Sequence, residues 1–404
     1  MKYNIHYFNE ALYPGMSANK VARVEMANSF LRVDKVEGVF FWFLSNRYFF
    51  NERSCFANQS LDKGVTPKRV WVPFFSDPLE VTGTKIDKAV RFVTKRVLFL
   101  WALVFFAIKR FEKSDLVFIR GEQFVLAFCL GALLKNVKFS FEVHNYEFGK
   151  FFLRDFLYRR ASKKANVIIV ISGYSRNHMV RNGGIKSSAI VNLPSGVNIQ
   201  RFSELSGDNA DYDLRLEIGA RENAKIAIYT GSLHKNRGIE DILFCAKKTP
   251  NIEFVIVGGN KSQIEEYLSK PDGDAKNIHF VGYKSNKLIP SIVSQGDVLL
   301  APYSKKIKTV MHMSPVKLFE YAAAEKPVVV SNISAIREIF NDDEVNYFTP
   351  DDRRDLLRCT REVFDNYDVC LAKAGRAKRK AELHSWDNRA KTIFKLLKKD
   401  NEQK

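Results

Sequence analysis

The 404-residue sequence has little of what marks secreted, metal-binding or membrane-spanning proteins. It holds only five cysteines, widely spaced and odd in number, with no CxxC pair, so neither a disulfide framework nor a cysteine zinc site is indicated. The start MKYNIHYFNE lacks the basic and then apolar pattern of a signal peptide. The longest apolar run, Val97 to Ile108, would span about 18 Å as a helix, well short of a bilayer. These absences predict a reducing, cytoplasmic setting and no transmembrane segment.

Positive charge is what the sequence has in excess. Lys and Arg number 64 against 45 Asp and Glu, which gives a net charge of +19. Such a balance implies an acidic partner: nucleic acid, an anionic membrane surface or a phosphorylated substrate. The basic residues are spread over both halves of the chain and no nucleic-acid-binding motif is present, so we expect no nucleic-acid partner.

Short β-branched runs alternate with longer helical patterns twice along the chain, which is typical of parallel sheets covered by helices. The first set of strands is expected at 2–8, 116–120, 138–144 and 166–172, and the second at 224–232, 252–259, 277–283, 297–303 and 327–332. A polar stretch, 203–223, lies between the two sets. We therefore expect an α/β protein with two Rossmann-like, doubly wound domains, 1–198 and 199–385, that face each other across a cleft, with a closing helix at 386–404 packed back on the first.

Ligands bind such sheets at the carboxyl ends of the strands. In the second domain, the loops TGSLHKNRG, VGGN and VGYKSN follow strands and supply the candidates Gly231, Ser232, Lys235, Arg237, Gly259 and Tyr283. Glycines permit close backbone approach, and Lys235 and Arg237 beside a helix start favour a bound diphosphate. The alternative is that both cations belong to a solvated loop.

The stretch SPVKLFEYAAAEKPVVVS predicts a helix with Ser314 as its N-cap and Pro315 as its first residue. Lys317 would then lie in the first turn, where the positive end of the helix dipole disfavours a cation unless an anion is near. A diphosphate is such an anion. Glu320, three residues on, could accept hydrogen bonds from the vicinal hydroxyls of a ribose, or could be an exposed acid that pairs with Lys317.

SPVKLFEYAAAEKPVVVS, YTGSLHKNRGIEDIL and NLPSGVNIQRF together resemble the C-terminal half of a retaining, nucleotide-sugar-dependent glycosyltransferase of family 4 (glycosyl transferases group 1), with the GT-B fold. FEVH, VIIVIS and HSWDNRA extend the resemblance over nearly the whole chain. It implies that Glu320 binds the ribose, that Arg237 holds the diphosphate and that the backbone of Gly15 contacts the phosphates.

Two positions depart from the family pattern. His312 stands where the family has the first glutamate of its Glu, seven residues, Glu pattern, and Ser232 stands where many members have an arginine. We expect Lys235 and Lys317 to supply part of the missing positive charge.

Two polar residues end strands of the first domain. His144 is either a satisfied core histidine or a contact of the donor sugar, and a family histidine at the end of the same strand favours the contact. Arg120 has the same two alternatives. We take His144, Arg237 and Lys317 as candidate catalytic residues and the others as nucleotide-sugar-binding. The triad DGD at 272–274 precedes a strand, lies on the amino edge, and is not expected to bind a metal.

The resemblance implies a metal-independent transfer of a hexose, with retention, from a nucleotide-diphosphate sugar such as a UDP-sugar to an acceptor hydroxyl. No cofactor is expected besides this donor substrate. The expected setting is synthesis of a bacterial capsule, O-antigen or exopolysaccharide on a lipid-linked or glycan acceptor, at the inner face of the cell membrane.

The stretches 94–110 and 150–164 are either helices that cover the sheet or a surface for anionic lipid. The alternative function is a sugar-nucleotide epimerase on the same fold, with His144 and His312 as acid and base.

Overall fold

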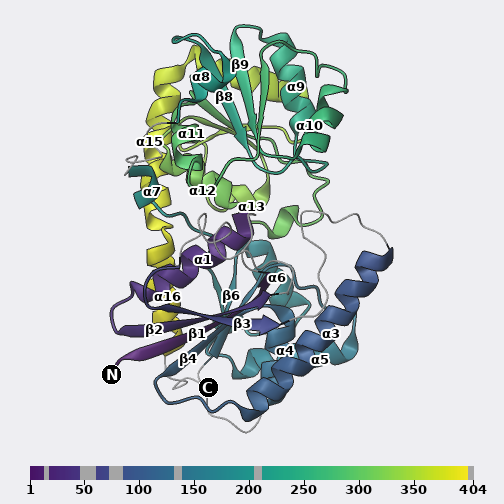
Figure 1. The fold of residues 1–404 in the computed structure, drawn as a ribbon, viewed down its shortest axis with the longest axis vertical. Coiled ribbons are helices and arrows are strands. Elements are labelled where there is room, and N and C mark those ends of the chain that lie inside the picture. Colours follow the sequence, from purple (N-terminus) through teal and green to yellow (C-terminus); the bar gives the residue numbers. More distant parts are fainter. Residues whose placement is uncertain (13–17, 46–60, 72–84, 132–138, 204–211, 399–404) are drawn as a thin grey trace. The chain divides into compact units, whose positions relative to one another are not determined.

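The computed structural model describes residues 1–12, 18–45, 61–71, 85–131, 139–203 and 212–398. The chain divides into two compact units (Figure 1): unit 1 is Met1–Leu193 with Trp386–Lys404, and unit 2 is Pro194–Ser385. The final helix, α16 (Trp386–Lys398), begins at the predicted residue and belongs to unit 1.

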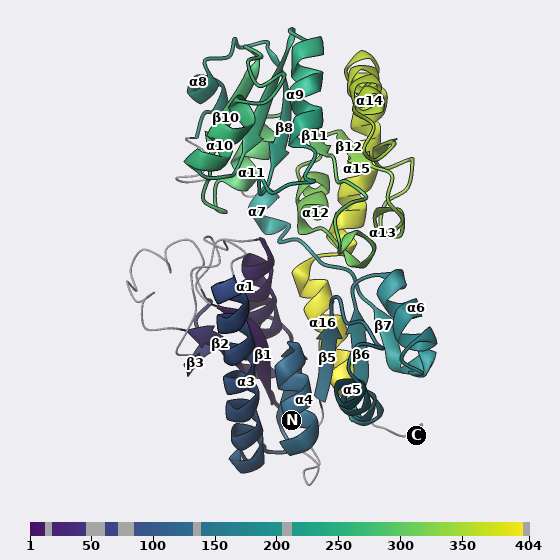
Figure 2. The ribbon, with the colours of Figure 1, turned by 90° about the vertical axis from the view of Figure 1, so that its right-hand side faces the viewer.

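Unit 1 contains a parallel sheet of seven strands in the order β3-β2-β1-β4-β5-β6-β7 (Figure 2). The strands are β1 (Tyr3–Leu12), β2 (Val36–Ser45), β3 (Val65–Trp71), β4 (Asp115–Arg120), β5 (Phe139–Val143), β6 (Val167–Val170) and β7 (Ile190–Asn192). The helices besides α16 are α1 (Ala18–Leu31), α3 (Lys85–Ile108), α4 (Glu122–Gly131), α5 (Phe152–Lys164) and α6 (Gly173–Arg181). The strand order reverses between β1 and β4, where doubly wound sheets bind ligands.

Side chains of β1 alternate between two covered faces. The Tyr7 ring packs against Phe30 of α1, with centroids 5.9 Å apart, whereas Phe8 packs against Phe106 of α3 at 5.0 Å and Phe124 of α4 at 5.5 Å. Because successive residues of a strand point to opposite faces, α1 covers one face of the sheet, and α3 and α4 cover the other. Helices on both faces explain why these strands are apolar runs.

Unit 2 contains a parallel sheet of six strands in the order β10-β9-β8-β11-β12-β13. The strands are β8 (Lys225–Thr230), β9 (Ile252–Val257), β10 (Ile278–Gly282), β11 (Val298–Ala301), β12 (Val328–Ser331) and β13 (Asn346–Phe348). The helices are α7 (Gln200–Ser203), α8 (Leu214–Ile218), α9 (Ile239–Lys248), α10 (Lys261–Leu268), α11 (Ile289–Ser294), α12 (Val316–Ala323), α13 (Ser334–Arg337), α14 (Arg353–Asp365) and α15 (Tyr367–Leu383). The expected α/β class with two doubly wound sheets is confirmed. Asp272 and Asp274 lie before β10 and pair with Lys247, at 3.5 and 3.0 Å.

The long apolar run of unit 1 forms the second half of α3. Leu98, Ala102 and Phe106 are buried against the sheet, whereas Leu100, Val104 and Ile108 are 60%, 57% and 73% exposed. The helix therefore covers the sheet with one side and leaves a line of apolar residues on the other. Across the described ranges, no helix combines the length and apolar character that spanning a membrane requires.

Candidate functional site

The strand ends of unit 2 approach one another closely at their carboxyl edge. Gly231 donates its N–H to the carbonyl of Val257, at 2.9 Å, and has φ +143°. A Cβ on Gly258, which has φ +131°, would lie 2.0 Å from the carbonyl oxygen of Gly231. Only glycine fits there, so the loops after β8 and β9 present bare backbone on the predicted edge.

Two cations converge on two tyrosine rings beside this backbone. The Nζ atom of Lys317, on α12, lies 3.9 Å from the ring centre of Tyr229 and 5.1 Å from that of Tyr303. The Cζ atom of Arg237, in the loop before α9, lies 5.9 Å from the Tyr303 ring centre. A Cβ on Gly231 would be 3.2 Å from the Lys317 Nζ. The arrangement therefore puts an ammonium and a guanidinium group next to the glycine loop.

The electrostatics of this pair favour a bound anion. Burial, and then the charge of Arg237, lower the pKa of Lys317 well below its usual value, while Glu320 acts in the opposite direction. Burial also raises the pKa of Tyr229 and of Tyr303, so both rings are neutral. Among the described residues, neither Lys317 nor Arg237 forms an ion pair. An anion with two negative charges would stabilise both cations at once.

The helix that carries Lys317 begins one residue later than predicted. α12 begins at Val316, with Pro315 as its N-cap and no side-chain cap. The prediction that Ser314 caps the helix was wrong, because its hydroxyl accepts the N–H of Ser195 at 2.8 Å and is buried there. Lys317 still lies in the first turn, where no acidic residue of the helix accompanies it.

The other candidates of unit 2 differ in exposure. Ser232 and Lys235 are exposed, as is Tyr283, whereas Gly259, Pro315 and Glu320 are partly buried and His312 is buried. Glu320 interacts electrostatically with Lys317 and Tyr303. Gly15 lies outside the described residues. The ligand contacts of all these residues stay predictions.

The carboxyl edge of unit 1 brings the predicted His144 and Arg120 together around a buried carboxylate. Oε1 of Glu142 lies 3.2 Å from Nε of Arg120 and 2.5 Å from Nε2 of His144. Its other oxygen accepts a hydrogen bond from Arg389 of α16, at 2.7 Å. Arg120 and His144 thus lie side by side at the ends of β4 and β5, with Glu142 holding both.

His144 is neutral at neutral pH. Burial, and then the charge of Arg120, lower its pKa to about 4, although Glu142 opposes the shift. Burial alone would raise the pKa of Glu142, but Arg389 and Arg120 hold it well below its usual value. Nε of Arg120 donates to Nε2 of His144 at 2.9 Å, and Oε1 of Glu142 lies against the same nitrogen. The neutral ring has one donor and one acceptor nitrogen.

A further carboxyl group near the end of β1 was not predicted. Glu10 accepts the N–H of Phe124, at 3.1 Å, and that of Gln123, both at the start of α4. Burial raises the pKa of Glu10 to about 7, although these hydrogen bonds act to lower it. Its charge therefore changes near neutral pH.

Four other residues of these clusters were also missed from the sequence. Glu142 is the one charged residue of the buried strand FSFEV, and Arg389 lies on the apolar face of the last helix, three residues after Trp386. A charge in such a position is a signal of a buried ion pair. Tyr229 and Tyr303 had a weaker signal, since each is an aromatic residue at the carboxyl end of a strand.

Two family models match the chain. "Glycosyl transferases group 1" matches residues 213–380 and "Glycosyltransferase Family 4" matches residues 63–201. Among curated relatives, the alpha-galactosylglucosyldiacylglycerol synthase of Streptococcus pneumoniae is 23% identical over 188 residues, 45% of this chain and 48% of the relative. The processive diacylglycerol alpha-glucosyltransferase of Acholeplasma laidlawii is 25% identical over 171 residues, 42% and 49% of the two chains. These matches span about half the length of each relative.

Solved structures resemble the whole chain. HepE of Anabaena in complex with UDP superposes with a TM-score of 0.69 over 98% of both chains, at 12% identity. The same protein with UDP-glucose gives a TM-score of 0.66 over 97% of this chain and 99% of that one, at 11% identity. At such identities the likeness shows the fold alone, but it agrees with two family models that match successive parts of the sequence. The chain belongs to the GT-B glycosyltransferases of family 4, the glycosyl transferases group 1.

Proposed function

We propose that the protein transfers a hexose from a nucleoside diphosphate sugar, UDP-linked in the first instance, to an acceptor hydroxyl. The observation that carries the proposal is the pair Lys317 and Arg237, two cations without an ion pair among the described residues, set beside the bare backbone at Gly231. A diphosphate supplies the compact negative charge that this place lacks. HepE, which shares the fold, has been solved with UDP and with UDP-glucose.

The same two cations would act in the reaction. As the bond between the sugar and the diphosphate breaks, negative charge grows on the leaving diphosphate, and fixed cations aimed at that charge stabilise the transition state. In this proposal Lys317 and Arg237 do the work that a divalent metal does in other enzymes. Activity should therefore persist in EDTA.

Glu320 and His144 would orient the donor. Glu320, one turn after Lys317 on α12, is a carboxylate that can accept hydrogen bonds from both ribose hydroxyls. His144 is neutral, so it suits a sugar hydroxyl better than it suits a phosphate. In this proposal the anomeric configuration of the sugar is retained if the leaving phosphate oxygen takes the proton of the acceptor hydroxyl on the same face of the sugar.

We further propose that the acceptor is lipid-linked and that unit 1 docks on an anionic membrane. The two curated relatives described above both have diacylglycerol in their names. At the start of α5, Phe151 and Phe152 are 64% and 83% exposed, with Leu153 and Phe156 also exposed. These four residues are called the α5 apolar cluster here, and Arg160 and Lys164 follow it on the exposed side of the helix.

Part of the expected membrane surface is used inside the fold instead. Tyr158 is 2% exposed and stacks on Tyr146, with ring centres 3.8 Å apart. Arg154 pairs with Glu122 at 3.4 Å, and Arg159 donates to the carbonyl of Gly183 at 2.9 Å. The proposed surface is therefore smaller than the stretch 150–164 and centres on the α5 apolar cluster.

Nucleotide binding tests the donor proposal directly. UDP-, GDP- and dTDP-sugars would each be tested for thermal stabilisation of the whole protein, since a ligand that binds only the folded state raises the melting temperature. We expect stabilisation by one nucleotide class, lost in Arg237→Ala and kept in Lys276→Ala, an exposed lysine before β10. No stabilisation by any of them, or stabilisation that survives Arg237→Ala, would contradict the proposal.

Product analysis then separates transfer from epimerisation. With the stabilising donor and no acceptor, a transferase leaves the sugar nucleotide unchanged or hydrolyses it slowly, whereas an epimerase converts it to a stereoisomer. We expect a new glycoside only when an acceptor is added. A stereoisomer formed without acceptor would replace the transferase proposal with the epimerase one.

A further inference from the structure

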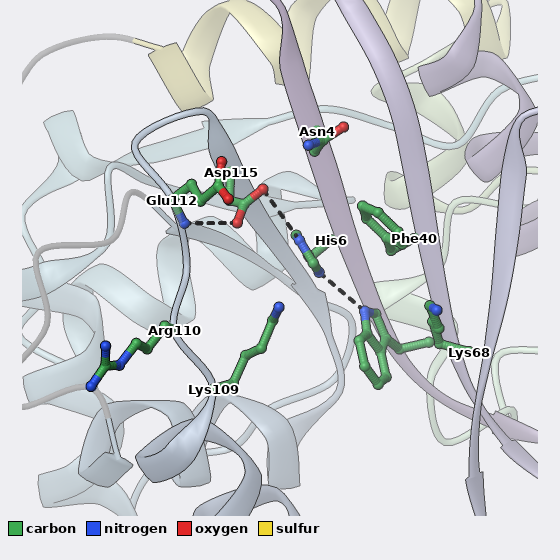
Figure 3. Close-up of a pocket in the computed structure, with 9 residues that line it drawn as sticks. Asn4, His6, Phe40, Lys68, Lys109, Arg110, Glu112 and Asp115 are labelled. Atoms are coloured by element: carbon green, nitrogen blue, oxygen red, sulfur yellow. Dashed lines mark hydrogen bonds and ion pairs between the residues drawn. The ribbon is translucent and has the colours of Figure 1, made fainter.

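A cavity of about 330 Å³ opens on unit 1, on the face of the sheet that α3 covers (Figure 3). It lies over the first half of β1, where His6 points into it, and beside Asp115, the first residue of β4. His144 and Arg120 follow or end their strands, so they lie at the opposite edge of this sheet. The cavity is therefore separate from the candidate site of unit 1.

Three neighbouring strands build the wall of this cavity. His6 of β1 pairs in register with Phe40 of β2, and Trp42 of β2 with Lys68 of β3. These residues share one face because side chains alternate along parallel strands. Histidine, tryptophan and lysine are unusual on a face that elsewhere carries residues such as Phe8 against α3.

The polar part of the wall is fixed by its own contacts. Nδ1 of His6 accepts a hydrogen bond from Nε1 of Trp42, at 3.3 Å, and Nε2 lies 3.5 Å from Oδ1 of Asp115. The His6 ring stacks on Phe40, with centres 4.7 Å apart. Oδ2 of Asp115 accepts the N–H of Glu112 at 2.8 Å. Both carboxyl oxygens of Asp115 thus already have partners, and the rings form the floor of the cavity.

Two lysines, Lys68 and Lys109, lie at the rim of the cavity. Nζ of Lys68 lies 5.6 Å from the ring centre of Phe40, and within the described ranges Lys68 forms no ion pair. The side chain of Lys109, from the loop after α3, extends toward His6, whereas Arg110 points away from it (Figure 3). The open space is therefore bounded by aromatic rings below and by ammonium groups at its rim, and Glu112 also lines it.

We propose that this cavity binds a small phosphate monoester, with the phosphate paired to Lys68 and Lys109 and the attached group lying on Phe40 and Trp42. Lysine binds phosphate as a compact point charge, and aromatic walls with a few placed charges are typical of small-ligand pockets. The volume is at the small end of the range for such pockets, about 300–1,000 Å³, which restricts the group that fits.

The phosphate monoester could be a free metabolite or the head group of a lipid such as phosphatidic acid. The exposed apolar line of α3 ends at Ile108, directly before Lys109, and would suit the chains of a lipid. In either case the ligand would bind without occupying the place beside Lys317 in unit 2.

Fluorine NMR on protein labelled with 5-fluorotryptophan tests the proposal without an activity assay. The sequence has four tryptophans, and Trp42→Phe would assign the Trp42 signal. We expect a saturable shift of this signal on titration with phenyl phosphate, both with and without UDP, and none with benzyl alcohol. Lys68→Ala combined with Lys109→Ala should weaken the affinity by about 100-fold or more, since each lost charged hydrogen bond accounts for about tenfold.

Lys113→Ala is the matched control, because Lys113 is an exposed lysine of the same loop that does not line the cavity. Phosphatidylcholine vesicles with and without phosphatidic acid form the second arm. A Trp42 shift that needs phosphatidic acid assigns the site to a lipid, and a shift with phenyl phosphate assigns it to a soluble ester. No Trp42 shift in either arm, or a shift that the double variant leaves unchanged while its melting temperature shows an intact fold, would overturn the proposal.

Discussion

Lys317 occupies a place that disfavours a cation on three grounds. It is largely removed from water, it lies near the guanidinium of Arg237, and it sits in the first turn of α12. Tyr229 compensates in part, because a cation over a ring face is attracted to it. The net effect is still a pKa of Lys317 well below the usual value. The charged form of Lys317 therefore lowers the stability of the free protein, and a bound anion offsets this cost.

Lys317→Met should therefore have opposite effects on the free and the ligand-bound protein. We expect the melting temperature of the free protein to rise slightly at neutral pH, because a poorly solvated charge is removed and the methylene stem is kept. Stabilisation by the nucleotide should be weaker, and turnover should fall by about 10²-fold, the usual effect of removing one electrostatic donor to a transition state. A lower melting temperature with unchanged turnover would show that Lys317 is structural.

The pKa of Lys317 also predicts a proton uptake. Between the lowered pKa and the ordinary value of 10.5, the free folded protein holds Lys317 deprotonated while the unfolded chain holds it protonated. Stability of the free protein should therefore rise with pH through this window. A bound diphosphate favours the charged form, so binding within the window should take up a proton.

Calorimetry of nucleotide binding in buffers with different ionisation enthalpies measures this uptake. We expect it in the native protein and not in Lys317→Met, provided that the variant retains enough affinity to be titrated. Equal uptake in both would assign the proton to another group.

Glu320→Ala should weaken nucleotide binding and largely abolish transfer while the fold stays intact, because its proposed partners are ligand hydroxyls. Glu222→Ala, at an exposed position before β8, is the control. Isothermal titration with the nucleotide and with the free diphosphate would locate the loss. The proposal for Glu320 predicts weaker binding of the nucleotide and unchanged binding of the diphosphate; a loss of folding with normal nucleotide affinity would refute it.

At the scale of elements, the apolar cluster of α5 carries the membrane proposal. Phe151→Ser combined with Phe152→Ser removes the two most exposed rings of this cluster. We expect sedimentation with acidic liposomes to fall in the variant, and binding of the native protein to weaken with salt, because attraction to an anionic leaflet is screened. Leu216→Ser, an exposed apolar residue of unit 2, should bind like the native protein. Negligible binding of the native protein to acidic and neutral liposomes alike, at low and high salt, would end the membrane proposal.

Some elements were readable from the sequence and others were not. β4, β5, β6 and four of the five predicted strands of unit 2 were found because a strand covered on both faces is a continuous apolar run. The fifth, β10, is a partly buried edge strand and was found from its own apolar residues. β3, with the sequence VTPKRVW, escaped the pattern because an edge strand tolerates proline and charge. β13 is only three residues long and offers no pattern.

The candidate site was predicted in its parts but not in its contacts. The glycines, the cations and Glu320 could be assigned to one edge because the segments that carry them follow strands along the chain. The rings that Lys317 contacts could not, because contacts between side chains of different strands, loops and helices leave no pattern in the sequence. Glu142 and Arg389 are separated by 247 positions, so only the folded chain brings them together. Ser314 fits the preferred chemistry of an N-cap, yet tertiary contact with Ser195 used its hydroxyl.

At the scale of the whole molecule, Arg389 ties the last helix to unit 1. It donates to the buried Glu142 at 2.7 Å and to the carbonyl of Leu193 at 3.2 Å. Arg389→Met leaves Glu142 with fewer cations in a buried setting, and breaking such a pair costs about 3–5 kcal/mol. We expect a drop of this size in the free energy of unfolding by urea. Lys391→Met, an exposed lysine of the same helix, should change it little; an equal effect of both changes would contradict the role of Arg389.

The contact between Arg389 and Leu193 has a further consequence for the genetic layout of the protein. The chain leaves unit 1 after Leu193 and re-enters it at Trp386, and Val197 pairs with Ser385 on the other side of this junction. Unit 2 is thus one continuous segment of the chain inserted into unit 1, and the two ends of this segment lie next to each other. A short connector from Leu193 to Trp386 could close unit 1 without it. The corresponding segment of a relative could then replace unit 2 in one exchange, leaving unit 1 and its helices as they are.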